Sequence, residues 1–444
     1  MDCVFIDRNL MLSSPAHADD VTLLTSYKTG LNDMFKMSLS YGRKWRYSYN
    51  TDKTVYMCWG TDLYPHIQIK FGDEILEPEK ESKHMGVNLT TDKKLIPTIC
   101  QKRIGKGKFA LLSGLGLGGT SVRTSPSTMS KIYWGVVIPK MLFGIEVTPT
   151  NDACIEMLED NHRYNARLIQ NLPTRTPKPA PVTILGWQSI KAYIAYVKIM
   201  FLIRVLCLEH DSLYRKLLIC GIDSYLEKGT QKIMSPVCDM MNYITQYRLQ
   251  EVVENCRING TWKMVDSLKK KVKSIILRCD EDLMKASSLM YRNLSIYREC
   301  VYYKKMNIWW KCVGKSSNAF KDVSCVVALL CGTQPNGYGV NFGSRRRCLL
   351  CCDYTTETLE HIIFECSAIE VRQSLMDNLI ESMPTGMRAS FISMNNQMKV
   401  KFILSGLGSE NYLHEWNNIY LSASKLIHNI YSERAAKYKS ITDC

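Results

Sequence analysis

The pattern of apolar residues changes near Lys102, and this change restricts the range of folds open to the chain. Before it, short apolar runs at residues 21–24, 55–59 and 67–69 alternate with polar turns, which is typical of short strands. After it, apolar residues recur at helical spacing in long segments, among them 152–172, 188–208, 262–277 and 412–437. Strands followed by helices predict an α+β fold.

Two stretches interrupt the helical part of the chain. Residues 172–181 contain Pro173, Pro177, Pro179 and Pro181, and because proline breaks the helical hydrogen-bond pattern, we expect an extended connector there. Residues 332–347 contain Pro335 and several glycines, which predicts an irregular boundary before a smaller unit.

The chain is strongly basic. Its 444 residues include 57 Lys and Arg against 42 Asp and Glu, which gives a formal net charge of +15 and favours a polyanionic partner. RNA or DNA is the expected partner, and an anionic membrane surface is the alternative. The longest apolar stretch, at residues 199–208, contains Arg204 and is too short to span a bilayer, so it predicts a buried helix and no membrane partner.

The N-terminal residues and the cysteines both favour an intracellular location. Residues 1–12 include Asp2, Asp7 and Arg8, which interrupt the apolar run that a secretory signal needs. The 18 cysteines are therefore interpreted as reduced thiols and metal ligands rather than as disulfide partners. We expect the protein in the nucleus, the cytoplasm or both.

Cys348, Cys351, His361 and Cys366 have the spacing of a structural zinc site. Two residues separate the first two cysteines, so one turn can present both thiolates to a metal ion, and the distant His and Cys complete a tetrahedron with no position for catalytic water. Cys352 is an alternative to Cys351, and buried cysteines beside a core histidine are the alternative to a metal site. Because His361 and Cys366 are five positions apart, we expect a helix to begin or end near one of them.

Two basic runs are candidate contacts for phosphate groups. They are Arg345, Arg346 and Arg347, and Lys269, Lys270 and Lys271. The arginines precede the first cysteine and are suited to a sequence-independent electrostatic contact, with a solvated charged segment as the alternative. The lysines lie in a helical segment with core-like spacing at Val265, Leu268 and Val272, and we favour a solvated helix face over a nucleic-acid track for them.

Asp19 and Asp20 are candidate ligands for Mg²⁺. Neighbouring residues of a strand point to opposite faces, so both carboxylates approach one metal ion only at a tight turn. Mg²⁺ prefers oxygen ligands and commonly binds the phosphate groups of a substrate at the same time. An ordinary surface turn is the alternative interpretation.

Further motifs follow Ala18-Asp19-Asp20 in a fixed order. They are Asn50-Thr51-Asp52-Lys53-Thr54, His84-Met85-Gly86-Val87, Leu142-Phe143-Gly144-Ile145-Glu146 and Leu185-Gly186-Trp187. Closed by the cysteine and histidine group, this series resembles the C-terminal part of the reverse transcriptases of non-long-terminal-repeat (LINE-type) retrotransposons. The resemblance covers nearly the whole chain.

The resemblance implies roles for several residues. Asp19 and Asp20 would be catalytic carboxylates on a palm hairpin, with Asp19 as the direct Mg²⁺ ligand, and Lys53 would lie near the phosphates of the incoming nucleotide. Residues 84–87 would form the hairpin that grips the primer strand. The implied division is a partial palm at 1–95, thumb-like helices at 96–150, a helical connector at 151–331, a zinc-binding unit at 332–375 and a C-terminal helical segment at 376–444.

The resemblance predicts a truncated reverse transcriptase (RNA-directed DNA polymerase) that binds RNA and DNA but has an incomplete catalytic centre. Polymerisation needs a further carboxylate from a separate strand, which lies upstream in this family, and only eighteen residues precede Asp19. His17 stands where the family has Tyr or Phe, and His84-Met85 replace Tyr-Leu in the primer-grip motif. The alternatives are an active reverse transcriptase in a fuller gene product, and a zinc-stabilised interaction protein that binds no nucleic acid.

Overall fold

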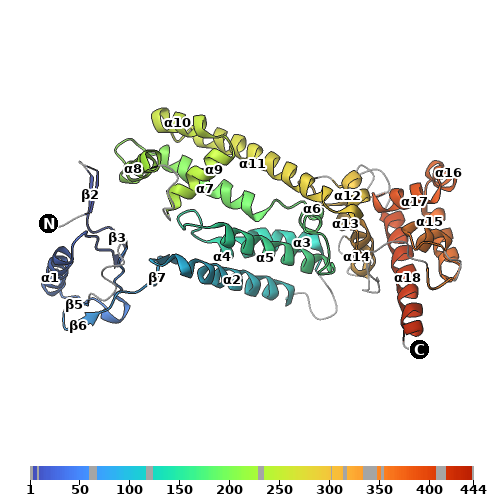
Figure 1. The fold of residues 1–444 in the computed structure, drawn as a ribbon, viewed down its shortest axis with the longest axis horizontal. Helices are drawn as coiled ribbons and strands as arrows, with labels where there is room; N and C mark the ends of the chain where they lie inside the picture. The colour runs from blue at the N-terminus through green and yellow to red at the C-terminus, as the bar shows by residue number, and fades with distance from the viewer. Residues whose placement is uncertain are drawn as a thin grey trace. The chain divides into compact units, whose positions relative to one another are not determined.

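The computed structural model describes residues 4–7, 10–59, 68–116, 124–228, 235–301, 303–313, 318–333, 348–351, 355–406 and 417–442. These residues are mostly helical and include small antiparallel pairs of strands (Figure 1). The predicted α+β class is therefore confirmed at this coarse level.

Every strand of the described residues lies in the first 95 positions, the part of the chain where the sequence predicts short strands, but the apolar runs at 21–24 and 67–69 meet a strand only at Val21 and Ile69. The antiparallel pairs are β1 (Val4–Asp7) with β2 (Leu10–Leu12), β3 (Ala16–His17) with β4 (Asp20–Val21), β5 (Ile69–Phe71) with β6 (Glu74–Leu76), and β7 (Glu81–His84) with β8 (Val87–Thr90). The run at residues 55–59 forms only an isolated bridge, between Tyr56 and Pro78, so the strand predicted there is wrong.

Helices fill most of the remaining described residues (Figure 1). The α-helices are α1 (Lys28–Trp45), α2 (Ile96–Gly116), α3 (Pro126–Ile132), α4 (Ile138–Leu142), α5 (Asp152–Gln170), α6 (Ala180–Ile184), α7 (Ile190–Leu206), α8 (Leu213–Lys228), α9 (Pro236–Gln246), α10 (Gln250–Asn259), α11 (Met264–Leu289), α12 (Ser295–Cys300), α13 (Ile308–Cys312), α14 (Asn318–Leu330), α15 (Arg372–Ser382), α16 (Thr385–Ser393), α17 (Asn396–Leu404) and α18 (Asn417–Thr442). Short 3₁₀-helices are η1 (Thr51–Lys53), η2 (Lys93–Leu95) and η4 (Arg292–Leu294), and η3 (Tyr133–Val137) and η5 (His361–Glu365) are π-helical turns. The four long helices predicted from the sequence correspond to α5, α7, α11 and α18.

Helix α1 lies in the part of the chain before Lys102, where the sequence pattern predicts strands and turns and no helix. Leu31, Phe35 and Leu39 lie four residues apart, which places them on one face of a helix. Phe35 packs with Ile69 and Phe71 of β5 in a small buried core, and Leu31 and Leu39 lie against its edge. These apolar residues gain burial only as a helix, so the predicted strand character of this segment is wrong.

The proline-rich stretch at residues 172–181 is not the extended connector that its composition suggested. The N–H of Thr176 donates to the carbonyl of Pro173 at 3.0 Å, and the N–H of Ala180 donates to that of Pro177 at 3.1 Å, so the chain makes successive turns. Helix α6 then begins at Ala180, with Pro181 in its first turn. Proline's fixed φ suits both turns and the first turn of a helix, which explains the compact path.

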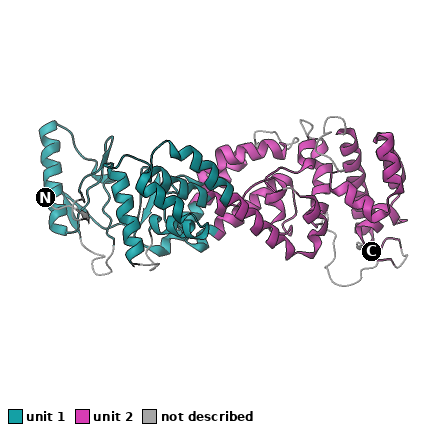
Figure 2. Ribbon diagram, turned by 90° about the horizontal axis from the view of Figure 1, so that it is seen from above, with its two compact units in different colours: residues 1–102, 142–155, 194–275 teal, residues 103–141, 156–193, 276–444 magenta. Residues whose placement is uncertain are grey.

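The described residues divide into two compact units, each built from several segments of the chain (Figure 2). Unit 1 comprises residues 1–102, 142–155 and 194–275, and unit 2 comprises residues 103–141, 156–193 and 276–444. In unit 1, residues 199, 200, 202, 203 and 206 of α7 are buried, which confirms the buried helix predicted for the longest apolar stretch. Within the described ranges, every helix is too short or too polar to cross a bilayer.

Unit 2 has a core rich in aromatic side chains. Tyr133 and Trp187 stack with ring centroids 4.3 Å apart, and the Tyr133 hydroxyl lies 2.8 Å from Nδ1 of the buried His162. The indole N–H of Trp310 donates to the side-chain oxygen of Gln170 at 2.8 Å. Towards the C-terminal end of this unit, α14 and α15 both pack against α18.

Candidate metal centre

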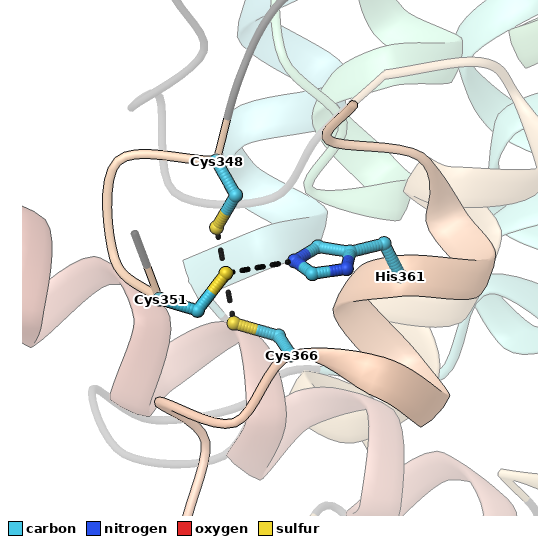
Figure 3. A group of neighbouring side chains, drawn as sticks. All are labelled: Cys348, Cys351, His361 and Cys366. Carbon is cyan, nitrogen blue, oxygen red and sulfur yellow. Dashed lines mark hydrogen bonds between the residues drawn. The ribbon is translucent and has the colours of Figure 1, made fainter. Parts of the chain in front are cut away.

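Cys348, Cys351, His361 and Cys366 present one ligand atom each to a common centre in unit 2 (Figure 3). Their ligand atoms all lie within 4.8 Å of one another. The sulfurs of Cys348 and Cys366 are 3.8 Å apart, and the Cys351 sulfur is 3.4 Å from Nε2 of His361. Among the described residues, no other group of three or more His, Cys, Asp and Glu side chains converges in this way.

These distances match the dimensions of a zinc tetrahedron. Zinc binds thiolate sulfur at about 2.3 Å and imidazole nitrogen at about 2.0–2.1 Å, so tetrahedral geometry separates two sulfurs by about 3.8 Å and a sulfur from a nitrogen by about 3.5 Å. The group can therefore hold a metal ion and is compatible with zinc. All four donors come from the protein, so a four-coordinate ion would have no free position for a reacting water.

A tight turn and a π-helical turn position the four side chains. The N–H of Cys348 donates to the carbonyl of Thr355 at 2.8 Å, which holds together the two ends of the loop that carries Cys351. The helical segment ends at Glu365, and the N–H of Cys366 donates back five residues to the carbonyl of His361 at 2.7 Å. This wide turn brings residues five apart to the same side, and it confirms that a helix ends near Cys366.

The second ring nitrogen of His361 faces polar groups rather than the centre. Nδ1 lies 3.3 Å from the Thr355 hydroxyl and 3.9 Å from a carboxylate oxygen of Glu365. A proton on Nδ1 leaves the Nε2 lone pair directed at the sulfurs, which is the tautomer that a metal ligand requires. Such partners of a ligating histidine fix its ring orientation and raise its affinity for the metal.

The Cys366 sulfur lies where a thiolate is unfavourable without a cation. Burial, reinforced by the neighbouring Cys348 thiol, raises the pKa of Cys366 to about 12. A divalent cation reverses this preference because it binds the deprotonated sulfur directly. The surroundings of Cys366 therefore favour a metal-bound sulfur over a free thiolate.

Contacts beyond the ligands anchor this group to the C-terminal helix. Glu357, four residues before His361, accepts from Arg434 Nε at 2.9 Å and from the Tyr438 hydroxyl at 2.9 Å, and both donors belong to α18. Arg372 at the start of α15 donates to the carbonyls of Phe364 and Cys366. Arg434 and Tyr438 could not be identified from the sequence, because no short-range spacing links either of them to Glu357.

Asp19 and Asp20 lie at a tight turn, which is the local geometry that two neighbouring carboxylates need to approach one metal ion. Strands β3 and β4 pair His17 with Asp20, and Ala18 and Asp19 form the two-residue turn between them, with a φ of 53° at Ala18. Both carboxylates are exposed. In the part of the chain that the structure describes, no third acidic, histidine or cysteine side chain joins them in a potential metal group.

Lys53 lies at the end of the 3₁₀-turn η1 and is exposed. Asn50 closes this turn, since its side-chain oxygen accepts from the N–H of Lys53 at 3.2 Å and its carbonyl accepts from the Thr54 hydroxyl at 2.8 Å. The motif therefore builds its own local structure. Its role near a nucleotide stays a prediction.

The predicted primer-grip motif is a β-hairpin, formed by β7, β8 and a two-residue turn with φ values of 48° at Met85 and 82° at Gly86. A Cβ atom on Gly86 would lie 2.9 Å from the Phe143 ring, and one on Gly144 would lie 2.6 Å from a methyl group of Val87. Two motifs that are distant in the sequence, at residues 84–87 and 142–146, thus pack directly against each other in unit 1.

Of the two basic runs, only the lysines belong to the described residues. Lys269, Lys270 and Lys271 are exposed on α11, whereas Val265 and Val272 of the same helix are buried, as expected for solvated lysines. The run Arg345, Arg346 and Arg347 lies outside the described residues, as does Cys352, the alternative ligand. Binding of phosphate by either run stays a prediction.

Comparison of the chain with protein-family models, with curated proteins and with solved structures gave no match. The likeness to reverse transcriptases therefore depends on the motifs in the sequence.

Proposed function

We propose that this chain is a zinc-containing, nucleic-acid-binding protein of reverse-transcriptase type that does not by itself extend a primer. The observation that carries the proposal is the convergence of Cys348, Cys351, His361 and Cys366 at zinc-like distances, at the end of a series of motifs ordered as in that family. The contact between the hairpin at residues 84–87 and the loop at 142–146 also supports it, because chance matches in sequence have no reason to be neighbours in space.

The zinc in this proposal has a structural role, and elemental analysis tests it. We expect about one zinc per purified chain, and loss of that zinc in Cys348→Ala and His361→Ala. Cys331→Ala is the matched control, since Cys331 is fully buried but lies outside the group. Zinc content that is unchanged in the two ligand variants would show that the ion is held elsewhere, and loss in Cys352→Ala but not Cys351→Ala would exchange those two ligands.

Nucleic-acid binding in this proposal follows from the charge of +15, which favours release of counterions from a bound polyanion. The purified chain should bind single-stranded RNA and DNA with little sequence preference, and log Kd should rise linearly with log salt concentration. A chain that binds neither at low salt would instead be a zinc-stabilised interaction protein.

Primer extension is not expected from this chain. Two-metal phosphoryl transfer uses carboxylates from separate strands, and among the described residues Asp19 and Asp20 gather no third acidic ligand. The test is template-directed incorporation on a primed RNA with Mg²⁺ or Mn²⁺, beside an Asp19→Asn variant. Incorporation by the parent chain that disappears in Asp19→Asn would mean that another carboxylate completes the site.

A further inference from the structure

The end of α1 and the segment after it form an exposed surface of alternating aromatic and basic residues. We call it the aromatic–basic surface, and it consists of Tyr41, Arg43, Lys44, Trp45, Arg46 and Tyr47. Tyr41, Trp45 and Tyr47 are 56%, 59% and 45% exposed, although aromatic rings of this size are usually removed from water. This surface lies in unit 1 and has no part in the metal centre.

Helix packing explains why the aromatic rings are exposed. Phe35 and its neighbours occupy the face of α1 that packs on β5, whereas Met37, Tyr41 and Trp45 repeat every four residues along a different, exposed face. These side chains are therefore not the edge of the described core. They form a separate apolar stripe on the surface.

A left-handed turn brings Tyr47 back over the end of this stripe. Arg46 ends α1 with a φ of 61°, and the N–H of Tyr47 then donates to the carbonyl of Gly42 at 3.0 Å. A Cβ atom on Gly42 would lie only 2.9 Å from the Tyr47 carbonyl oxygen, so the close return of the chain depends on glycine at this position.

The rings are held in place by contacts with one another. The ring centroid of Tyr41 lies 6.0 Å from that of Trp45 and 6.3 Å from that of Tyr47. Tyr47 contacts Tyr49 at 5.4 Å, with their hydroxyls 3.1 Å apart, and Tyr49 contacts the buried Phe71 at 5.7 Å. A continuous series of aromatic contacts thus runs from the buried core to the exposed rings, which limits their motion before any ligand arrives.

Positive charge surrounds these rings. Arg43, Lys44 and Arg46 are exposed, and no acidic residue occurs between Asp33 and Asp52 in the sequence. None of the three cations forms an ion pair with a described residue, and the Lys44 ammonium lies 5.8 Å from the Trp45 ring centroid. The surface therefore offers flat apolar rings and uncompensated cations within one short segment.

We infer that the aromatic–basic surface is a stacking site for single-stranded nucleic acid, an assignment that rests on the proposed function. Unpaired bases stack on Tyr41, Trp45 and Tyr47, and the flanking phosphates contact Arg43, Lys44 and Arg46. A duplex does not fit this role because its bases already stack on one another, whereas every unpaired base offers a free aromatic face. An apolar protein partner fits poorly, since it would bury three cations without counter-charges.

Fluorescence anisotropy with labelled 20-nucleotide oligo(U), oligo(dT) and a duplex of equal length tests this inference. Trp45→Ala and Tyr41→Ala should each weaken single-strand binding by about 5- to 150-fold, and Trp45→Phe should restore most of the affinity, because stacking contributes about 1–3 kcal/mol per base. Trp262→Ala is the matched control, as Trp262 is 62% exposed elsewhere in unit 1. The oligo(U) and oligo(dT) arms show whether RNA or DNA is preferred.

A charge series adds an independent readout. Replacing Arg43, Lys44 and Arg46 by Gln should reduce the slope of log Kd against log salt by about 2, since each phosphate contact to a single strand contributes about 0.7. Lys216→Gln, Lys321→Gln and Lys425→Gln together make the matched control with the same change in net charge, since these three lysines are exposed and lie outside both basic runs. An equal loss of affinity in the control would mean that net charge alone acts, and would overturn the inference.

Crosslinking of the parent chain keeps the inference testable even if a variant does not fold. An oligonucleotide containing 5-iodouridine should form ultraviolet-induced adducts within residues 41–49. Binding by the parent chain with adducts only elsewhere, or with unchanged affinity in Trp45→Ala and Tyr41→Ala, would overturn this site and leave the proposed function standing. Absence of all binding by the parent chain would overturn both, and loss of self-association alone in Trp45→Ala would assign the surface to a second copy of the chain.

Discussion

The ion pair between Glu357 and Arg434 should control how firmly the metal-binding turn is attached to α18. Both side chains are largely buried, with 11% of Glu357 and 4% of Arg434 exposed, and two guanidinium nitrogens contact the same carboxylate oxygen at 2.6 and 2.9 Å. Arg434→Met keeps much of the side-chain volume but leaves the carboxylate without its counter-charge. Breaking a buried pair in this way costs about 3–5 kcal/mol.

We expect the lower end of this range, because the Tyr438 hydroxyl, which donates to Glu357 at 2.9 Å, is still present in the variant. A loss of about 3 kcal/mol makes local opening about 150-fold more frequent. Hydrogen–deuterium exchange of the zinc-loaded chain should show this acceleration in peptides covering residues 355–375 and 417–442, and far less outside them.

Lys437→Met on the same helix is the matched control for Arg434→Met. Lys437 forms ion pairs with Glu370 and Glu433, each at 2.7 Å. Because the Lys437 side chain is 33% exposed and that of Glu370 is 82% exposed, the ion pair with Glu370 contributes at most about 1 kcal/mol. Exchange that accelerates no more in Arg434→Met than in Lys437→Met would refute the reasoning. A Glu357→Gln background should also reduce the cost of Arg434→Met, since the uncompensated charge is then absent.

Three further predictions concern packing and protonation. Gly144→Ala should lower the free energy of unfolding by about 2–4 kcal/mol in urea titrations, because the φ of 69° disfavours alanine and its Cβ would lie 2.6 Å from Val87. Lys198→Met should cost about 3 kcal/mol in the same assay, since Lys198 is fully buried and donates to Asp239 at 2.9 Å. Burial raises the pKa of Glu159 from its usual 4.5 to about 7, so between these pH values the folded chain keeps a proton there that the unfolded chain releases. The stability that protonated Glu159 contributes is therefore complete below about pH 4.5 and is lost as the pH rises through about 7. Glu159→Gln should therefore show a smaller fall in Tm between pH 5 and pH 8 than the parent chain.

Helices with a long apolar repeat could be predicted from the sequence, whereas α1 could not. The repeat in α7 is dense enough to identify a buried helix by itself, and residues 199, 202, 203 and 206 are indeed buried. In α1 the buried set is sparse, and its apolar partners, Ile69 and Phe71, come from a strand far along the chain. A helix stabilised by such distant contacts carries a weak local signal, because packing rather than propensity contributes most of its stability.

The turns in residues 172–181 depend on side-chain hydrogen bonds, which the number of prolines does not predict. Four prolines in residues 172–181 correctly excluded a continuous helix, but they did not specify whether the chain extends or folds back. The Thr176 side chain decides this locally, since its hydroxyl donates to the Pro173 carbonyl at 2.6 Å and Thr176 is only 3% exposed. The bound hydroxyl removes the cost of burying a polar group, so the stretch packs inside unit 2.

The two candidate metal sites differ in what their sequence spacing determines. A Cys-x-x-Cys turn places two ligands by local geometry alone, so only the approach of His361 and Cys366 depended on the fold, and a single π-helical turn supplies both of these. Asp19 and Asp20 also have their local geometry from the sequence, as the turn at Ala18 shows, but a magnesium site needs an acidic group from another strand. Local spacing can therefore specify a closed four-ligand centre, whereas a catalytic centre assembled from separate strands depends on long-range packing. The aromatic–basic surface lies between these cases: a segment of seven residues, 41–47, carries every ring and cation, but only the left-handed turn at Arg46 and the exposed face of α1 bring them together.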